Sequence, residues 1–483
     1  MNLHPLIEQG WMNAILPELI LSVAGMILIL VDAFAPRAKA VLAPLTIILV
    51  TIAAWSENLV KGGTFFGGTY EISAITRVFD ITFFLATMLA TLFARDYLDR
   101  ERIEGGEFYA LLLWGAVGMM MMAKGLDLLI IVLGLEILSL CIFVLCGYHR
   151  RLAVANEASL KYFLMGAFAT GFILYGTALF YGATQSTNIT KMGQWFATGT
   201  ATPILTIAFV LLMSGFGFKL ALAPFHPWAP DVYQGAPTPV AGWLSVAPKA
   251  ATLIALVRIF ASMMPTFHLA RWSTMVATLS VLSMIIGNAV AIAQRDLKRM
   301  LAYSGIAHVG YMLIAMLSVR DQSVAAVTVY VITYALMNIG AFGVVSMLAK
   351  NQNDPQTLDD IAGLGFRRPF YGLALTICMF SLSGLPPTAG FIAKFYVFKT
   401  AVDSGYTGIA LVGILTSIVS VYYYLRVVYY LYMKEAPEGY AVPVAGMFAT
   451  GALAISMIGI FVIGIFPTPL FEMAGAAAHA LLP

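Results

Sequence analysis

Long apolar stretches separated by short polar connections run through the whole chain. A membrane-spanning helix needs about 20 mostly apolar residues, and fourteen stretches of about this kind follow one another. They lie at 14–34, 38–56, 76–94, 107–123, 126–147, 158–182, 203–223, 238–261, 272–293, 300–318, 323–348, 370–402, 407–433 and 442–466. The connections are too short for a soluble domain. The pattern therefore predicts an all-α polytopic membrane protein in which residues 1–483 form a single membrane domain.

Two of these stretches combine a Gly/Pro interruption with a lysine. They are the seventh, "SGFGFKLALAPFHPW", and the twelfth, "SLSGLPPTAGFIAKF". Because they are five spans apart, they cross the membrane in opposite directions, which is typical of an inverted-topology repeat with broken helices at matching positions. We expect two five-helix units, spans 4–8 and 9–13. The predicted divisions are helices 1–3 in 1–100, unit one in 107–261, unit two in 272–433 and a C-terminal helix in 442–466.

Composition supports the membrane interpretation and argues against redox groups on this chain. The sequence is 60% hydrophobic and 11% charged, whereas soluble domains carry about 25% charged residues. The three cysteines lie inside apolar stretches, the six histidines are scattered, and no CxxC motif is present. No GxGxxG fingerprint follows a strand. We therefore expect no haem, iron–sulfur, zinc or dinucleotide site on this chain, and no nucleic-acid partner.

The distribution of basic residues predicts the orientation in the membrane. Connections after odd-numbered spans hold fourteen Lys and Arg residues, and those after even-numbered spans hold seven. The positive-inside rule then places the odd connections in the cytoplasm and both termini on the periplasmic side.

Six cations remain in or near the spans. Lys249 lies at the centre of the eighth span, and Lys394 lies deep, beyond the break of the twelfth. Charges at such depth are costly and are functional by default, whereas long side chains near helix ends can reach the headgroups. Lys219 directly precedes the break of the seventh span, and Lys161 lies near the start of its span, where either interpretation holds. The last two, Lys399 and Arg426, lie near span ends and favour the headgroup interpretation.

Glu136 is the acidic residue placed at mid-span, in "VLGLEILSL". A buried carboxylate needs a partner to stay charged, so we expect one of the central lysines beside it. Lysine loses its charge on desolvation and regains it near a carboxylate, whereas arginine stays charged. The deep lysines and Glu136 therefore suggest a proton relay, with structural ion pairs as the alternative. His308 in the tenth span is either a further proton carrier or a hydrogen-bonded core residue.

Several long motifs resemble one known family. They are "FKLALAPFHPWAPDVYQGAPTPV", "VLGLEILSL", "ASLKYFLMGAFATGFILYG", "AIAQRDLKRMLAYSGIAHVGYML" and "SGLPPTAGFIAKF". Together they resemble the antiporter-like membrane subunits of proton-pumping NADH:quinone oxidoreductase, complex I, through spans 4–13. The length and the "LKYFLMGAFATGFILYG" stretch are most similar to the N branch of that family. One departure is Gln234, where relatives often have Glu.

The resemblance implies roles for specific residues. Glu136 and Lys219 would form an ion pair modulated by Lys161, and His226 would bridge Lys219 to Lys249. Lys249 would be the central proton carrier, and the terminal one would be Lys394. NADH, FMN, iron–sulfur clusters and quinone would bind to partner subunits. The expected partners are neighbouring antiporter-like and small membrane subunits and the lipid bilayer, in a hetero-oligomer.

The resemblance leaves alternatives open. The chain would move protons in the inner membrane of a bacterium, but organellar inner-membrane or thylakoid homologues have similar lengths. A second hypothesis is an Mrp-type cation/proton antiporter subunit with the same fold. A third is a scaffold in which the buried charges are structural.

Overall fold

The computed structural model describes residues 11–35, 39–103, 105–198, 202–263, 269–318, 321–348, 357–435 and 446–481. Three of the basic residues used to predict the orientation, Arg37, Arg320 and Lys350, lie outside the described residues.

The N-terminal part forms helices and a short β-hairpin. Its elements are α1 (Trp11–Ala14), α2 (Leu16–Phe34), α3 (Lys39–Ser56), β1 (Gly63–Phe65), β2 (Tyr70–Ile72) and α4 (Ala74–Glu101), with 3₁₀ turns at Glu57–Leu59 and Phe66–Gly68. The hairpin is antiparallel and pairs Gly63 with Ile72 and Phe65 with Tyr70. It was not predicted, because its strands are three residues long and lie inside a predicted connection. Its turn contains Gly67 and Gly68 at positive φ, where glycine has no steric cost.

The described part of the first predicted unit contains seven helices. They are α5 (Gly106–Lys124), α6 (Leu128–Cys146), α7 (Ala153–Thr184), α8 (Ile189–Thr198), α9 (Pro203–Lys219), α10 (Trp228–Gly235) and α11 (Thr238–Met263). The predicted break of the seventh span is confirmed, since α9 ends at Lys219 and α10 begins only at Trp228. The short helix α8 lies between two predicted spans and was not expected.

The rest of the described chain is also helical. Its helices are α12 (Leu269–Ala293), α13 (Leu297–Ala315), α14 (Asp321–Leu348), α15 (Leu364–Arg367), α16 (Pro369–Ser383), α17 (Ala389–Asp403), α18 (Thr407–Met433), α19 (Met447–Ile465) and α20 (Thr468–His479), with a 3₁₀ turn at Asp359–Ile361. The twelfth span is also broken, between Ser383 and Ala389. The unpredicted α20 contains five alanines or glycines in a row and packs on α14 and α4.

Each of the fourteen predicted stretches contains a helix. Length and apolar composition qualify eleven helices of the described chain to cross a membrane, and α9 and α16 are apolar but shorter. These two helices are short because each is the first part of a broken helix. The chain is therefore a multi-pass helical membrane protein, although helix length alone does not establish a count of fourteen crossings.

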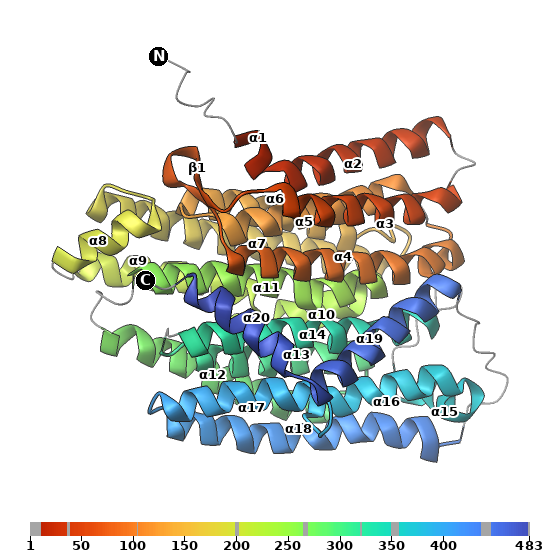
Figure 1. Cartoon of the computed structure of the whole chain (residues 1–483). Coiled ribbons are helices and arrows are strands. Elements are labelled where there is room, and N and C mark those ends of the chain that lie inside the picture. The colour runs from red at the N-terminus through yellow and green to blue at the C-terminus, as the bar shows by residue number, and fades with distance from the viewer. Residues whose placement is uncertain are drawn as a thin grey trace.

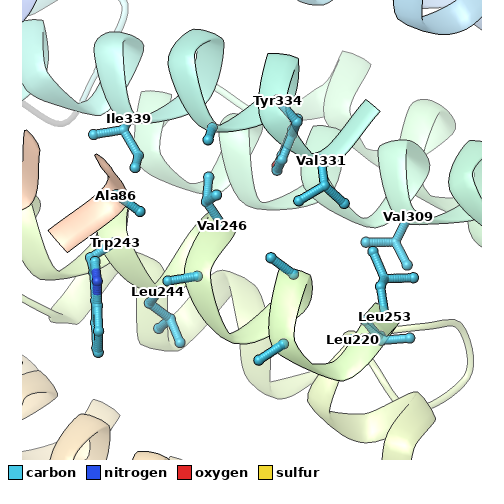
Figure 2. Packing of buried hydrophobic residues seen from close by; sticks show 14 of the residues in the cluster. Ala86, Leu220, Trp243, Leu244, Val246, Leu253, Val309, Val331, Tyr334 and Ile339 are labelled. Carbon is cyan, nitrogen blue, oxygen red and sulfur yellow. The ribbon is translucent and has the colours of Figure 1, made fainter. Parts of the chain in front are cut away.

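Two helices form the centre of the bundle. The apolar window of α11 is 100% buried and that of α14 is 94% buried, whereas α2, α18 and α19 bury about a third of theirs. Figure 1 shows α11 and α14 between the N-terminal helices and α16–α18. Figure 2 shows α11 side chains packed against Val331, Tyr334 and Ile339 of α14. A residue on α11 is thus enclosed by protein on every side.

Candidate functional site

Lys219 is the last residue of α9, at the point where the helix breaks. Its side chain is 5% exposed, and Nζ donates a hydrogen bond to Ser139 Oγ at 2.7 Å. The rings of Phe143, Tyr162 and Phe218 lie 5.5 to 6.0 Å from Nζ, a distance at which aromatic faces attract a cation. The ammonium is therefore held by one hydroxyl and three aromatic faces.

Glu136 lies one turn before Ser139 on α6, yet it makes a different contact. Its carboxylate is half-buried and accepts a hydrogen bond from Thr170 Oγ1 of α7 at 2.6 Å. Among the described residues no hydrogen bond or ion pair joins Glu136 to Lys219. Ser139 links the two positions through α6, and the ion pair remains a prediction.

Lys161 is the exposed member of the predicted set. Its side chain is 44% exposed and forms ion pairs with Glu157 at 2.6 Å and with Asp231 at 3.0 Å. Asp231, on α10, also pairs with Arg299 of α13 at 2.7 Å. The charge of Lys161 therefore contacts the second half of the broken helix rather than Lys219 directly.

Lys249 lies in the middle of the fully enclosed helix α11. The residue is 3% exposed, and its Nζ has no hydrogen-bond partner within the described chain. The Tyr233 ring lies 5.8 Å from Nζ, and a methyl group at Gly305 of α13 would lie 2.7 Å from Nζ and 2.9 Å from Tyr334 Oη. Pro248 inside the helix has no N–H to donate to the carbonyl one turn earlier. Lys249 is thus a buried amine without a fixed partner.

His308, on α13, is hydrogen-bonded through both ring nitrogens. Nδ1 lies 2.7 Å from Tyr330 Oη and Nε2 lies 3.0 Å from Tyr424 Oη. The ring of Tyr334, which borders Lys249, lies 5.1 Å from the imidazole. His308 therefore satisfies the description of a hydrogen-bonded core residue and also adjoins the surroundings of Lys249.

Lys394 lies beyond the second break, on α17. Nζ donates to the Ser383 carbonyl at 3.0 Å and to Ser417 Oγ at 2.9 Å. The ring of Tyr311 lies 5.4 Å from Nζ and 5.8 Å from the imidazole of His308. Tyrosine rings thus connect Lys249, His308 and Lys394 in one buried row.

His226 lies within the first break and is half-buried. The centroids of the His226 and Tyr303 rings lie 6.3 Å apart in an edge-on arrangement. Nδ1 has no hydrogen-bond partner among the described residues. Among the described residues no hydrogen bond or ring contact joins His226 to Lys219 or Lys249. Its bridging role stays a prediction.

Comparison with known proteins identifies the family. Residues 125–420 match the family described as NADH:quinone oxidoreductase/Mrp antiporter, transmembrane. The NADH-quinone oxidoreductase subunit N of Trichlorobacter lovleyi is 42% identical over 99% of both chains. The chain belongs to the N-subunit family of NADH-quinone oxidoreductases. The N subunit of Salinibacter ruber is 43% identical over 79% of this chain and 78% of its own.

Solved structures share the fold of this N-subunit family member. A chain of respiratory complex I from Thermus thermophilus matches with a TM-score of 0.82 and 34% identity, covering 95% of this chain and 100% of its own. A chain of the Mrp complex from Dietzia sp. DQ12-45-1b matches with a TM-score of 0.85, covering 98% of both chains. At 18% identity, the second likeness shows the fold alone.

A second group of buried charges in this N-subunit chain was missed by the sequence analysis. Lys124, at the end of α5, is fully buried and contacts Glu18 at 2.8 Å, Glu57 at 3.1 Å and Asp80 at 2.8 Å. Tyr70 Oη of the hairpin donates to Glu18 at 2.6 Å. Burial, and after it the Glu18 carboxylate, raises the pKa of the Tyr70 hydroxyl, so Tyr70 keeps its proton at neutral pH. We call these five residues the Lys124 cluster.

Lys124 is one of the seven basic residues counted in the connections after even-numbered spans, and Asp80, near the start of the third span, was expected at the membrane interface. Both predictions were wrong, since both side chains are fully buried. One signal was available. Glu18 starts the first span, Glu57 follows the second, Asp80 starts the third and Lys124 ends the fourth. Successive spans alternate in direction, so these four positions lie at the same side of the membrane. Among the described residues no group of His, Cys, Asp and Glu is arranged to hold a metal ion.

Proposed function

We propose that this chain is the proton-translocating antiporter-like membrane subunit of a respiratory NADH:quinone oxidoreductase. The observation that carries the proposal is the buried row of Lys249, Tyr334, His308, Tyr311 and Lys394 through the centre of an N-subunit fold. A desolvated lysine can lose and regain a proton near neutral pH, which arginine cannot do. The buried row and the membership of the chain in the N-subunit family support the same function.

Each residue has a stated part in this proposal. Lys249 carries the proton at the centre, because no described residue forms a hydrogen bond that would hold its Nζ in place. Lys219 and Glu136 form an ion pair. Lys161 modulates this pair through Asp231 of the broken helix. His226 bridges Lys219 to Lys249. In the second unit, His308 passes protons toward Lys394, and the Ser383 carbonyl, freed by the helix break, holds the Lys394 ammonium.

The surroundings of the chain follow from the same proposal. The units 107–261 and 272–433 are inverted repeats, and both termini lie on the periplasmic side of a bacterial inner membrane. NADH, FMN, iron–sulfur clusters and quinone bind to partner subunits, and this chain performs no redox chemistry. The Mrp-type antiporter alternative has less support, because the Mrp likeness is 18% identical whereas N-subunit relatives are 36 to 43% identical.

Inverted membrane vesicles from the source organism test the function. NADH should drive proton uptake that requires this chain in the assembled complex, and adding sodium should not change the rate. The Mrp-type alternative predicts instead that this chain supports sodium efflux in vesicles lacking the other complex I subunits. That second result would replace the proposed function.

A methyl group beside Lys249 tests the central position without removing the lysine. In Gly305→Ala the new Cβ would lie 2.7 Å from Nζ and 2.9 Å from Tyr334 Oη, so one of these groups must move. Small displacements of reacting groups cost up to about 100-fold, and we expect NADH-driven proton uptake to fall by about tenfold or more. Gly451→Ala on α19, where a Cβ has open space, is the matched control. Equal uptake in the two variants would contradict the assigned position.

A further inference from the structure

A cavity with both polar and apolar lining residues lies at the end of the bundle where α4 and α6 finish and α7 and α13 begin. Its volume is about 170 Å³, and its lining includes Tyr97, Glu101, His149, Val154, Gln234 and Lys298. One water needs about 10–15 Å³ of such space, so the cavity has room for several. Val154 in the first turn of α7 is 54% exposed, which places the mouth of the cavity at the protein surface.

Two buried ionisable side chains meet at this cavity. His149 Nε2 lies 3.7 Å from Glu101 Oε2, and the two side chains are 2% and 1% exposed. Neither ring nitrogen of His149 makes a hydrogen bond to any described residue. Imidazole is the side chain whose ordinary pKa lies closest to neutral pH. A buried imidazole that lines the cavity and lies beside a carboxylate can pass a proton to that carboxylate.

Two helices that line the cavity, α10 and α13, also lie beside Lys249. Gln234 of α10 lines the cavity, and its neighbour Tyr233 has its ring 5.8 Å from Lys249 Nζ. Lys298 of α13 also lines the cavity, and Gly305, seven residues further along, borders Lys249 Nζ. Seven residues of helix span about 10 Å. The same two helices therefore border both the cavity and the central lysine.

We propose that Glu101 and His149 form the proton-uptake site through which Lys249 is loaded from the predicted cytoplasmic side. This inference rests on the proposed function. The other ionisable side chains at the cavity are Tyr97 of α4 and Lys298 of α13, and α7 contributes only apolar residues. Lys298 is held by the Ala236 carbonyl at 3.1 Å and by Thr238 Oγ1 at 3.3 Å, so its charge is fixed beside the entrance to the core.

The transfer is balanced in protons. A hydronium ion at the mouth gives one proton to His149 Nδ1 and becomes water. The imidazolium passes a proton from Nε2 to the Glu101 carboxylate, and the resulting carboxylic acid releases it along α10 and α13. The neutral amine of Lys249 accepts it and becomes an ammonium. No bond other than those to hydrogen forms or breaks.

Charge-neutral replacement of Glu101 tests the site in the assembled complex. In Glu101→Gln we expect NADH-driven proton uptake by inverted vesicles to fall by about tenfold or more, at the lower end of what a positioned proton donor contributes. The matched control is Asp99→Asn, which removes the same charge two residues away from an exposed side chain and should pump as the wild type does. Equal uptake in Glu101→Gln and Asp99→Asn would overturn the proposal.

Imidazole rescue separates proton uptake from a structural role. His149→Gly leaves space for one imidazole molecule, and in inverted vesicles the predicted cytoplasmic face is outside. We expect added imidazole to restore uptake relative to wild-type vesicles at the same imidazole concentration, and to leave Glu101→Gln unchanged. Assembled His149→Gly complex that pumps normally, or that imidazole does not restore, would overturn the proposal. If Lys249→Ala blocks uptake while the Glu101 and His149 variants do not, only the uptake site fails. If none of the three affects pumping, the proposed function fails as well.

Discussion

Lys249→Ala is expected to stop NADH-driven proton uptake, with a fall of at least about tenfold, while the complex still assembles. Assembly should persist because Lys249 Nζ has no hydrogen-bond partner among the described residues, so its loss leaves no charge unpaired. Proton uptake by inverted vesicles, together with native electrophoresis of the complex, measures the two effects. Coupled quinone reduction should slow with it.

Two further variants distinguish proton transfer from a structural charge. Lys249→Arg keeps the charge but cannot release a proton, so it should fail as Lys249→Ala does. Lys399→Ala removes a lysine that is exposed and paired with Asp403 at 2.6 Å, and should leave uptake unchanged. Normal pumping in Lys249→Arg would show that the position requires only a positive charge, and normal pumping in Lys249→Ala would exclude the relay.

Lys124→Met is expected to lower the stability of the complex, whereas Lys249→Ala should lower proton pumping and leave assembly intact. Three carboxylates that are each less than a tenth exposed would lose their only ammonium partner in the cluster. Removing one partner from a buried ion pair costs about 3–5 kcal/mol. The midpoint of thermal unfolding of the complex, and the amount of this chain in the membrane, should both fall.

The control for this variant lies on the neighbouring connection. Lys61 is exposed, and Lys61→Met should leave stability unchanged. The double variant Lys124→Met with Asp80→Asn should recover part of the loss, because it removes a charge of each sign. If Lys124→Met is no less stable than Lys61→Met, the cluster does not hold the N-terminal helices together.

The features that the sequence predicted well depend on local composition. Apolar stretches of about 20 residues predicted the helices, because a membrane span must satisfy its own backbone and present apolar side chains. The breaks after Lys219 and Ser383 were predicted because Gly and Pro interrupt a helix wherever it lies. Lys249 and Lys394 stood out because charge within an apolar stretch is rare.

The features that were missed depend on how distant segments meet. Lys124 lies at the end of its apolar stretch, and its burial follows from contacts with Glu18, Glu57 and Asp80 of three other segments. Hydropathy could not show that Glu136 accepts a hydrogen bond from Thr170 of α7, and its expected pairing with a central lysine stays a prediction. Helix α20 is too short for a span, and it is recognisable only from its packing on α14. Hydropathy reports depth along one helix, not the direction a side chain faces.

The complete enclosure of α11 has a consequence for how the central lysine can work. Protein interiors are close-packed, so a helix surrounded on all sides cannot tilt or slide without displacing several neighbours at once. Movement of the Lys249 ammonium therefore depends mainly on its side chain, whose four methylene groups set its reach. The Lys249 side chain can therefore contact one neighbouring group at a time. A proton that it has delivered cannot return to it while the side chain points away from the acceptor.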